Sequence, residues 1–309
     1  MNGVHMVPST HQSLVWGMLL LGGLFLLEGC DPTVDVLEPS EQYQYSLFAA
    51  LNVAADTQVV RVEPIGDTTQ VGSPPELEAR VILKNLDAGT QVRLQDTYET
   101  VGQVATVHNF RTTHALQAGT SYRLIVQKEG RPVTTATTTT PKRPPTLLHS
   151  VEGETQPFLL PCEFDAQGNP TERQNTFSVR AKHLDHLAAV KVYYPLGRSN
   201  SAPEGAGGID YLDAAEHRDG GGYRLPIFYG QDLHALFRGT ENRCVPRSAF
   251  VHPFATVVVA AGGPDWPQWR EASLDNLARP DTFSNVKGGH GFVGAIYTDT
   301  VRVPIEVRE

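Results

Sequence analysis

The sequence predicts a mostly all-β protein with two β-rich domains, the second of which also contains one or two short helices. Three observations predict this fold class. Apolar and polar residues alternate in short segments, a turn glycine precedes Tyr122 at the start of one such segment, and prolines are concentrated over 141–145. With 309 residues and 40% hydrophobic content, the chain is long enough to form two cores of ordinary size.

The first strand pair is predicted from period-two alternation. Over Leu77–Lys84, apolar and polar residues alternate, as expected of a strand with one buried face. Ile82 is the one apolar residue at a position where the pattern calls for a polar one. The sequence Asp87-Ala88-Gly89 then provides a turn, and alternation resumes over Gln91–Gln95. We therefore expect these segments to form a β-hairpin.

The segment Leu116–Val126 contains the most specific fold signal. Gly119 lies shortly before Tyr122, which begins an alternating strand in which Arg123 and Gln127 should face water. This arrangement resembles the tyrosine corner of immunoglobulin-like and fibronectin type III sandwiches, where the phenol forms a hydrogen bond with an upstream backbone group. The resemblance implies an N-terminal domain that is an immunoglobulin/fibronectin III-like sandwich.

A threonine-rich strand over Thr134–Thr140 is followed by the sequence Pro141-Lys142-Arg143-Pro144-Pro145. Prolines lack a backbone donor and favour extended chain, so a domain boundary is expected there. The predicted organisation is a signal peptide over 1–29, a flexible tether over 30–44, the sandwich domain over 45–140, a proline-rich linker over 141–146 and a C-terminal β-rich domain over 147–309.

The C-terminal domain is predicted to consist of short strands and long glycine-containing loops. The expected strands are rich in Val, Tyr and Phe and cover Thr176–Arg180, Val190–Tyr194, Gly222–Tyr229 and Val257–Ala261, with one or two more over Gly294–Val307. Helices are expected over Gln231–Arg238 and from near Pro267 to the residue before Pro280.

The N-terminal segment Leu14–Leu27 is apolar and uncharged, and its length suits the core of a signal peptide better than a membrane span. It is followed by Leu27-Glu28-Gly29-Cys30, which resembles the bacterial lipobox. The resemblance implies that diacylglycerol is attached to the Cys30 thiol and that Cys30 becomes the new N-terminus, carrying acyl chains such as palmitate. The alternative is a cleaved secretory peptide with an incidental cysteine; in both cases the protein is exported.

The two remaining cysteines, Cys162 and Cys244, would then lie in an oxidising compartment. They are a disulfide candidate, and the alternative is a pair of unpaired buried thiols, because the spacing does not show that they meet. The formal net charge of −9 and a pI near 5.7 argue against a nucleic-acid-binding surface.

The C-terminal sequence Ser284–Gly294, together with Asp56–Val62 and the lipobox, resembles a family of Bacteroidota lipoproteins, the domain of unknown function 4249 family (DUF4249). The resemblance implies an outer-membrane lipoprotein, often found beside TonB-dependent receptors. It implies neither an established activity nor catalytic residues.

Three further motifs favour ordinary structural roles over cofactor or metal binding. Gly289–Gly294 formally matches a dinucleotide fingerprint, but no βαβ unit fits around it, so we expect a glycine-rich loop with positive φ and Phe292 in the core. Histidines flanking Asp185 and carboxylates over Asp210–Asp219 are expected to be solvated or internally satisfied. No metal or cofactor is predicted; the residues considered as ligands are His183, His186, Asp210, Asp213, Glu216 and Asp219.

Trp266 and Trp269 are the candidate ligand-binding residues, because exposed indoles can stack on sugar rings; core packing or anchoring of a helix start is the alternative. The leading hypothesis is a non-enzymatic lipoprotein that is anchored to the outer membrane through Cys30, on its periplasmic or outer face. It would bind a ligand or a partner receptor of the TonB-dependent type. The other hypotheses are a glycan-binding or adhesion lipoprotein and an extracellular hydrolase that uses groups around Asp210–Asp219.

Overall fold

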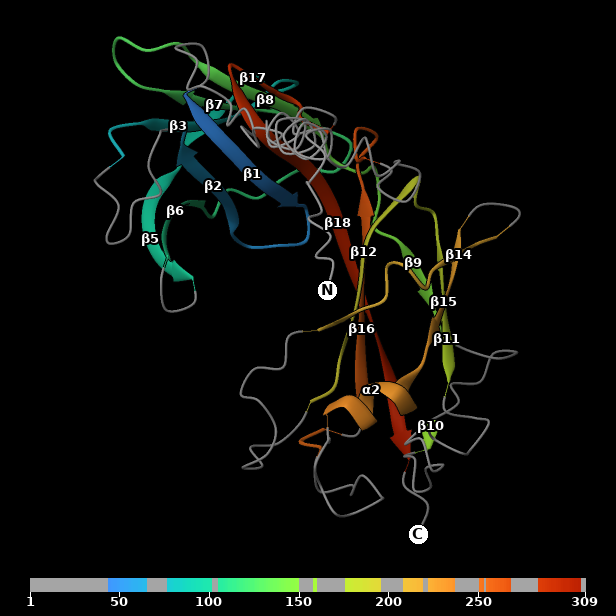
Figure 1. Cartoon of the computed structure of the whole chain (residues 1–309). Coiled ribbons are helices and arrows are strands. Elements are labelled where there is room, and N and C mark those ends of the chain that lie inside the picture. The colour runs from blue at the N-terminus through green and yellow to red at the C-terminus, as the bar shows by residue number, and fades with distance from the viewer. Residues whose placement is uncertain are drawn as a thin grey trace, which may run out of the picture. The chain divides into compact units, whose positions relative to one another are not determined.

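The computed structural model describes residues 44–65, 77–101, 105–149, 158–159, 176–195, 208–218, 222–236, 250–252, 254–267 and 283–306. In these residues the strands form three sheets, and α2 (Tyr229–Leu236) is the one helix (Figure 1). The mostly all-β fold predicted from the sequence is confirmed. None of the described helical residues forms a segment long and apolar enough to cross a membrane.

The largest sheet has nine strands, eight of which follow one another edge to edge. β1 pairs in parallel with β18, and all other neighbours along this path are antiparallel. β10 (Phe158–Leu159) pairs separately with the end of β18. The path runs through β13 (Ile209–Asp210), β12 (His186–Tyr193), β16 (Phe254–Gly262), β18 (Gly289–Glu306), β1 (Tyr45–Asn52), β2 (Gln58–Pro64), β6 (Ala105–Thr112) and β5 (Gln95–Val101).

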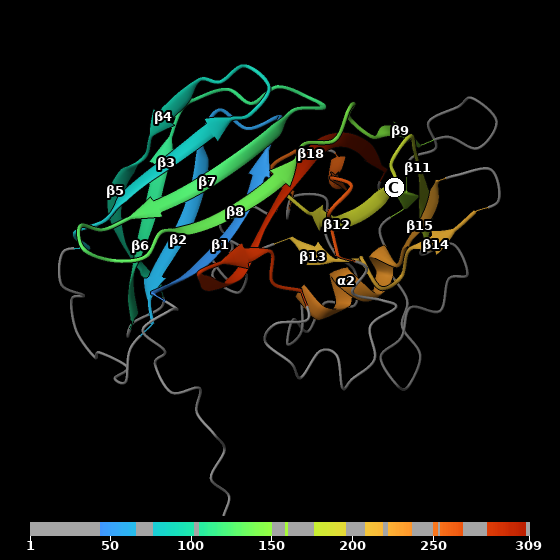
Figure 2. The same cartoon turned by 90° about the horizontal axis from the view of Figure 1, so that it is seen from above.

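A five-stranded sheet packs against one part of the large sheet, so the N-terminal region is sandwich-like (Figure 2). Its order is β17 (Val286–Lys287), β8 (Thr134–Thr139), β7 (Ser121–Gln127), β3 (Arg80–Asn85) and β4 (Gln91–Arg93). The first core lies between the two layers because alternate residues of each strand point inward. Its fully buried members include Leu47, Val60, Val81, Leu124 and Val126.

A four-stranded antiparallel sheet and α2 enclose the second core. The order of this sheet is β14 (Glu216–His217), β15 (Tyr223–Ile227), β11 (Phe177–Lys182) and β9 (Thr146–Leu148). Val179 and Leu225 from this sheet pack with Val190 and Val257 of the large sheet and with Leu233 of α2. The charged residues of β11 and β15 are left on the opposite face.

The long strand β18 contributes to both cores with the same face. Val293 and Ala295 belong to the first core, and Val303 belongs to the second. These odd-numbered positions lie on one side of the strand because side chains alternate with a period of two. Apart from Val293 and Ala295 of β18, the buried members of the first core precede residues 141–146, and those of the second core follow them, so β18 joins the two cores.

The tyrosine corner predicted at Tyr122 is confirmed. The backbone N–H of Gln117 donates a hydrogen bond of 2.9 Å to the phenol oxygen of Tyr122, whose side chain is almost fully buried. Thr140 Oγ1 donates to the carbonyl of Gln117 at 2.7 Å, so β8 is tied to the same turn. Gly119 has a φ of 67°, as this turn requires.

We expect Tyr122→Phe to lower the free energy of unfolding by about 1–2 kcal/mol, because the phenyl ring fits the same space but leaves the Gln117 N–H without its acceptor. Urea denaturation of the full chain measures the change. Tyr193→Phe is the matched control, since Tyr193 is 40% exposed, and it should be nearly neutral. Equal stabilities of the two variants would contradict a structural role for the Tyr122 phenol.

The remaining predicted elements are largely confirmed. The expected hairpin is the pair β3–β4, and the predicted C-terminal strands correspond to β11, β12, β15 and β16. The first predicted helix is α2, which begins two residues earlier than expected. The end of the chain forms the single strand β18, which starts at Gly289, and the second predicted helix lies beyond the described residues after Pro267.

Candidate functional site

Three buried polar side chains, Tyr194, Tyr211 and Asp232, meet at the start of α2. Both phenols donate to Asp232 Oδ2, Tyr194 at 2.6 Å and Tyr211 at 2.7 Å. The Tyr211 oxygen in turn accepts a hydrogen bond of 2.9 Å from the backbone N–H of Phe228. Because each of the three side chains is less than one tenth exposed, these bonds form in the protein interior. We refer to the three residues as the Asp232 cluster.

Burial dominates the electrostatics of the Asp232 cluster. It raises the pKa of Asp232 above its usual value, while hydrogen bonds from Tyr194 and Tyr211 oppose that rise. Burial also raises the pKa of Tyr194 and of Tyr211 well above that of a free tyrosine, and the nearby carboxylate of Asp232 raises both further. Both tyrosines therefore stay protonated and act as hydrogen-bond donors.

These shifts predict a loss of stability at alkaline pH. Below about pH 10, the two phenols are protonated in both the folded and the unfolded chain. Above it, Tyr194 and Tyr211 ionise only in the unfolded chain, so the stability that they contribute is lost as pH rises toward their folded pKa. Urea denaturation between pH 8 and 11 measures the free energy of unfolding. This free energy should fall less steeply with pH in the variant with Tyr194→Phe and Tyr211→Phe than in the native chain, and equal slopes would contradict the pKa shifts.

The Asp232 cluster also fixes the backbone that leads into β14. Tyr211 starts a tight turn, in which its carbonyl accepts a hydrogen bond of 3.2 Å from the N–H of Ala214. Asp210 Oδ1 accepts another, of 2.8 Å, from the N–H of Leu212. Directly after this turn, Glu216 begins β14 and pairs with Arg224 of β15. A buried cluster therefore positions an exposed, charged hairpin.

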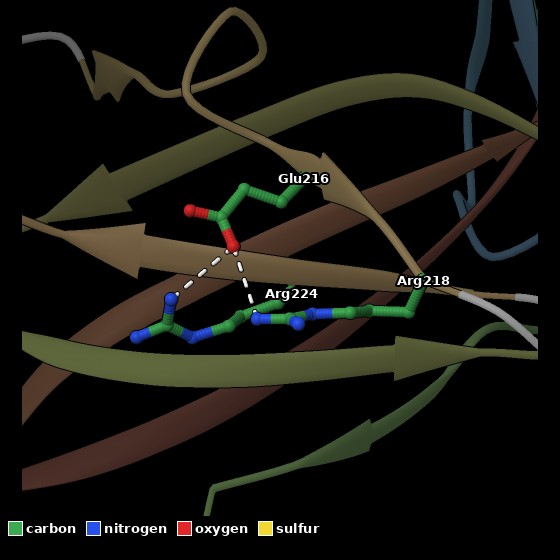
Figure 3. Close-up of polar contacts among 3 residues, drawn as sticks. All are labelled: Glu216, Arg218 and Arg224. Carbon is green, nitrogen blue, oxygen red and sulfur yellow. Dashed lines mark hydrogen bonds and ion pairs between the residues drawn. The ribbon is translucent and has the colours of Figure 1, made fainter.

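Glu216 is the centre of an exposed ion-pair group on this hairpin (Figure 3). Its Oε2 atom accepts from Arg218 Nη2 at 3.1 Å and from Arg224 Nη1 at 3.2 Å. All three side chains are at least 40% exposed, so solvent weakens these pairs and each contributes little to stability. One carboxylate between two guanidinium groups leaves a net positive charge.

Strand register extends this positive charge across the four-stranded sheet. Arg180 of β11 lies directly opposite Arg224 of β15, and Lys182 lies two residues further along β11. Arg180 and Lys182 are exposed and have no ion-pair partner among the described residues. We call this surface the basic face; it comprises Arg180, Lys182, Arg218, Arg224 and Glu216.

Trp266, one of the two candidate ligand-binding residues, packs on the large sheet. Its indole lies against Gly262 of β16 and Gly294 of β18, where a Cβ on either glycine would overlap the ring. The ring of Phe292 meets it edge to face, at 5.4 Å between centroids. Part of the indole surface is thus already used in packing, and the buried Nε1 has no hydrogen-bond partner among the described residues.

The other site residues predicted from the sequence lie outside the described residues. These are the lipidation candidate Cys30, the disulfide candidates Cys162 and Cys244, and the second candidate tryptophan, Trp269.

Several of the histidines and carboxylates considered as metal ligands make other contacts, and Asp219 lies outside the described residues. His183 and His186 lie at a turn and at the start of β12, not on a helical turn, and His183 Nδ1 is 2.9 Å from Thr146 Oγ1. Asp210 caps a turn, and Glu216 pairs with arginines. Within the described ranges, no three His, Cys, Asp or Glu side chains are grouped closely enough to hold a metal ion.

The glycine-rich motif Gly289–Gly294 forms the start of β18, not a loop. The predicted positive φ occurs at Gly291, with a φ of 105°. Phe292 is only half-buried and lies outside both cores, in contrast to the expectation that it would pack inside.

No protein-family model matches this chain, and a search of curated protein sequences also gives no match.

Proposed function

We propose that this protein is an exported lipoprotein that is anchored to the outer membrane through Cys30 and acts by binding at the cell envelope rather than by catalysis. The observation that carries the proposal is the sequence Leu14–Cys30, an uncharged apolar segment followed directly by a small residue and cysteine.

Two observations support this proposal. Residues 31–44 are polar and acidic without a sustained apolar pattern, which suits a flexible tether between an anchored Cys30 and a folded body. The polar atoms of the Asp232 cluster bond to one another, which is typical of a structural role, while the exposed charges lie on a sheet surface where a partner can reach them.

Mass spectrometry of the N-terminal peptide tests the anchor. The full chain is expressed in a bacterium with lipoprotein-processing enzymes, beside a Cys30→Ala variant. We expect a mature chain that begins at diacylglyceryl-modified Cys30 and sediments with membranes, whereas Cys30→Ala should lack the modification. A chain that keeps Met1 or has an unmodified Cys30 would refute the anchor.

Cross-linking on intact cells, followed by purification of the tagged chain, tests the binding role. We expect recovery of an envelope receptor, with a TonB-dependent transporter as the leading candidate partner. Hydrolytic turnover by the purified chain, without any cross-linked envelope protein, would instead support an enzyme.

A further inference from the structure

We propose that the outward side of the five-stranded sheet binds an extended acidic polysaccharide, a polymer of sugar units that carry carboxylate groups. The proposal rests on the proposed binding role at the cell envelope and adds a surface and a ligand class to it. We call this surface the cation–hydroxyl face. It comprises the cations Arg80, Lys84, Arg93, Arg123 and Lys287 and the hydroxyl residues Ser121, Thr135, Thr137 and Thr139.

The five strands of this sheet contain no aspartate or glutamate. This is unusual in a chain that has 34 acidic residues and a formal net charge of −9. The basic face differs, because Glu216 lies among its cations and pairs with Arg218 and Arg224. An acidic ligand therefore meets a repelling carboxylate on the basic face but none on the strands of the cation–hydroxyl face.

The carboxylates at the margins of the cation–hydroxyl face are already engaged. Asp87 Oδ2 accepts a hydrogen bond of 3.1 Å from a backbone N–H of β7, and Asp265 Oδ1 accepts one of 3.3 Å from a backbone N–H of β8. Glu78 Oε2 lies 3.4 Å from Lys128 Nζ. None of the five cations of the face has an ion-pair partner in the part of the chain that the structure describes, so their charge remains available to a ligand.

Strand register groups these cations. Lys84 of β3 lies directly opposite Arg123 of β7, and like charges at such positions destabilise a sheet. On the other side of β3, Arg93 of β4 lies opposite Ile82. Its diagonal neighbours on β3 are Arg80 and Lys84, which are within reach of a long side chain. A bound carboxylate would relieve the repulsion, and guanidinium groups bind carboxylates through two parallel hydrogen bonds.

The spread of the charges requires an extended ligand. Arg80 and Lys84 lie about 13 Å apart along β3, and four strand spacings of about 4.8 Å each separate β4, which carries Arg93, from β17, which carries Lys287. One anionic group cannot contact all of these side chains, whereas a polymer with a carboxylate on successive units can. Figure 2 shows β3, β4, β7 and β8 side by side, so such a polymer can cross several strands.

The uncharged side chains of the face favour a polysaccharide over other polyanions. The hydroxyl groups of Thr135 and Thr137 can donate and accept hydrogen bonds, as sugar hydroxyls do. The five strands present no outward aromatic side chain on which nucleic-acid bases could stack. Ile82 and Ile125 are paired with each other and partly buried, so little apolar surface is left to insert into a bilayer.

An open hollow of about 560 Å³ continues the face, and both Arg80 and Arg93 line it. Lys128, Glu78 and Glu129 also line this hollow, so three cations and two carboxylates leave it with a net positive charge. Its volume falls within the range of small-ligand sites. Part of the polymer can therefore lie below the sheet surface, within reach of both arginines.

Retention of the full chain carrying Cys30→Ala on immobilised polygalacturonate tests the proposal without the covalent lipid. Fully methyl-esterified polygalacturonate is the matched probe, because it has the same sugar backbone but no charge. The measured quantity is the apparent dissociation constant for each polymer. We expect binding to the charged polymer at about 0.1 M salt that is lost at about 1 M, where the screening length is about 3 Å, and no binding to the esterified polymer.

Neutralisation of the facing pair locates the site. Lys84→Gln with Arg123→Gln should weaken binding by on the order of tenfold, because each exposed ion pair contributes up to about fivefold. Urea denaturation should show no loss of stability, since these substitutions remove a repulsion. Arg180→Gln with Lys182→Gln removes the same charge from the other positive surface, the basic face, and so separates position from net charge. It should have a much smaller effect, because Glu216 remains there to repel the polymer.

Three outcomes would overturn the proposal: equal retention on the charged and esterified polymers, equal losses in the two pairs of Gln substitutions, or binding that depends on Lys84 and Arg123 to vesicles of phosphatidylcholine with phosphatidylglycerol but not to polygalacturonate. The last result would assign the face to a bilayer. Modification of Cys30 and cross-linking to an envelope receptor are scored separately. A chain that passes those tests but is not retained on polygalacturonate therefore refutes the cation–hydroxyl face alone.

Discussion

The Gly291→Ala variant should be severely destabilised, by about 4 kcal/mol or more, and is expected to accumulate poorly as folded protein. Gly291 has a φ of 105°, in a region that residues with a Cβ rarely adopt. An added Cβ would also overlap the carbonyl oxygen of Leu47, the residue paired with Gly291 in the parallel β1–β18 ladder. Backbone strain and a backbone clash therefore act together, and no side-chain rotation relieves either of them.

Gly89→Ala is the control for this substitution. Gly89 also has a positive φ, of 71°, but nothing lies within 4 Å of the position of its Cβ. It should therefore lose only the roughly 1–2 kcal/mol that the left-handed conformation costs an alanine. Thermal and urea denaturation of both variants provide the comparison, and equal losses would show that β18 does not approach β1 as closely at Gly291 as described.

Removal of the buried acceptor in the Asp232 cluster should have the second largest effect. Asp232→Ala is expected to cost roughly 3–5 kcal/mol, because the hydroxyl groups of Tyr194 and Tyr211 would both remain buried without an acceptor. Asp232→Asn should cost much less, since it keeps an oxygen that can accept both bonds and removes a charge whose burial is unfavourable, as the raised pKa of Asp232 indicates.

A mutant cycle separates this cause from a simple loss of volume. Combined with Tyr194→Phe and Tyr211→Phe, Asp232→Ala leaves no phenol unsatisfied, so its additional cost should be much smaller than in the native background. Urea denaturation of the four chains of the cycle measures the coupling. Additive free energies would show that the three side chains are not coupled, in conflict with the hydrogen bonds described.

The sequence predicted the elements that obey local rules. The alternation over Leu77–Lys84 and the spacing between Gly119 and Tyr122 each depend on neighbouring residues, and both are confirmed as the strand β3 and the tyrosine corner. The helix α2 was predicted with a shift of two residues, as is usual for helix boundaries.

Features that depend on long-range register could not be predicted in this way. Tyr194, Tyr211 and Asp232 are far apart in sequence and share no periodic pattern, so only the folded arrangement shows that they meet. Similarly, Arg180 and Arg224 become neighbours through the pairing of β11 with β15. The composition, which is acidic overall, gave no indication of a local positive surface.

The pairing of β1 with β18 also has a consequence for the order of events during synthesis. β1 is the first described strand, but its parallel partner is made of residues 289–296 of β18. The large sheet therefore cannot close until residues 289–296 have left the ribosome. Such non-local pairing slows folding. We therefore expect the large sheet to close late, only after β18 has been synthesised.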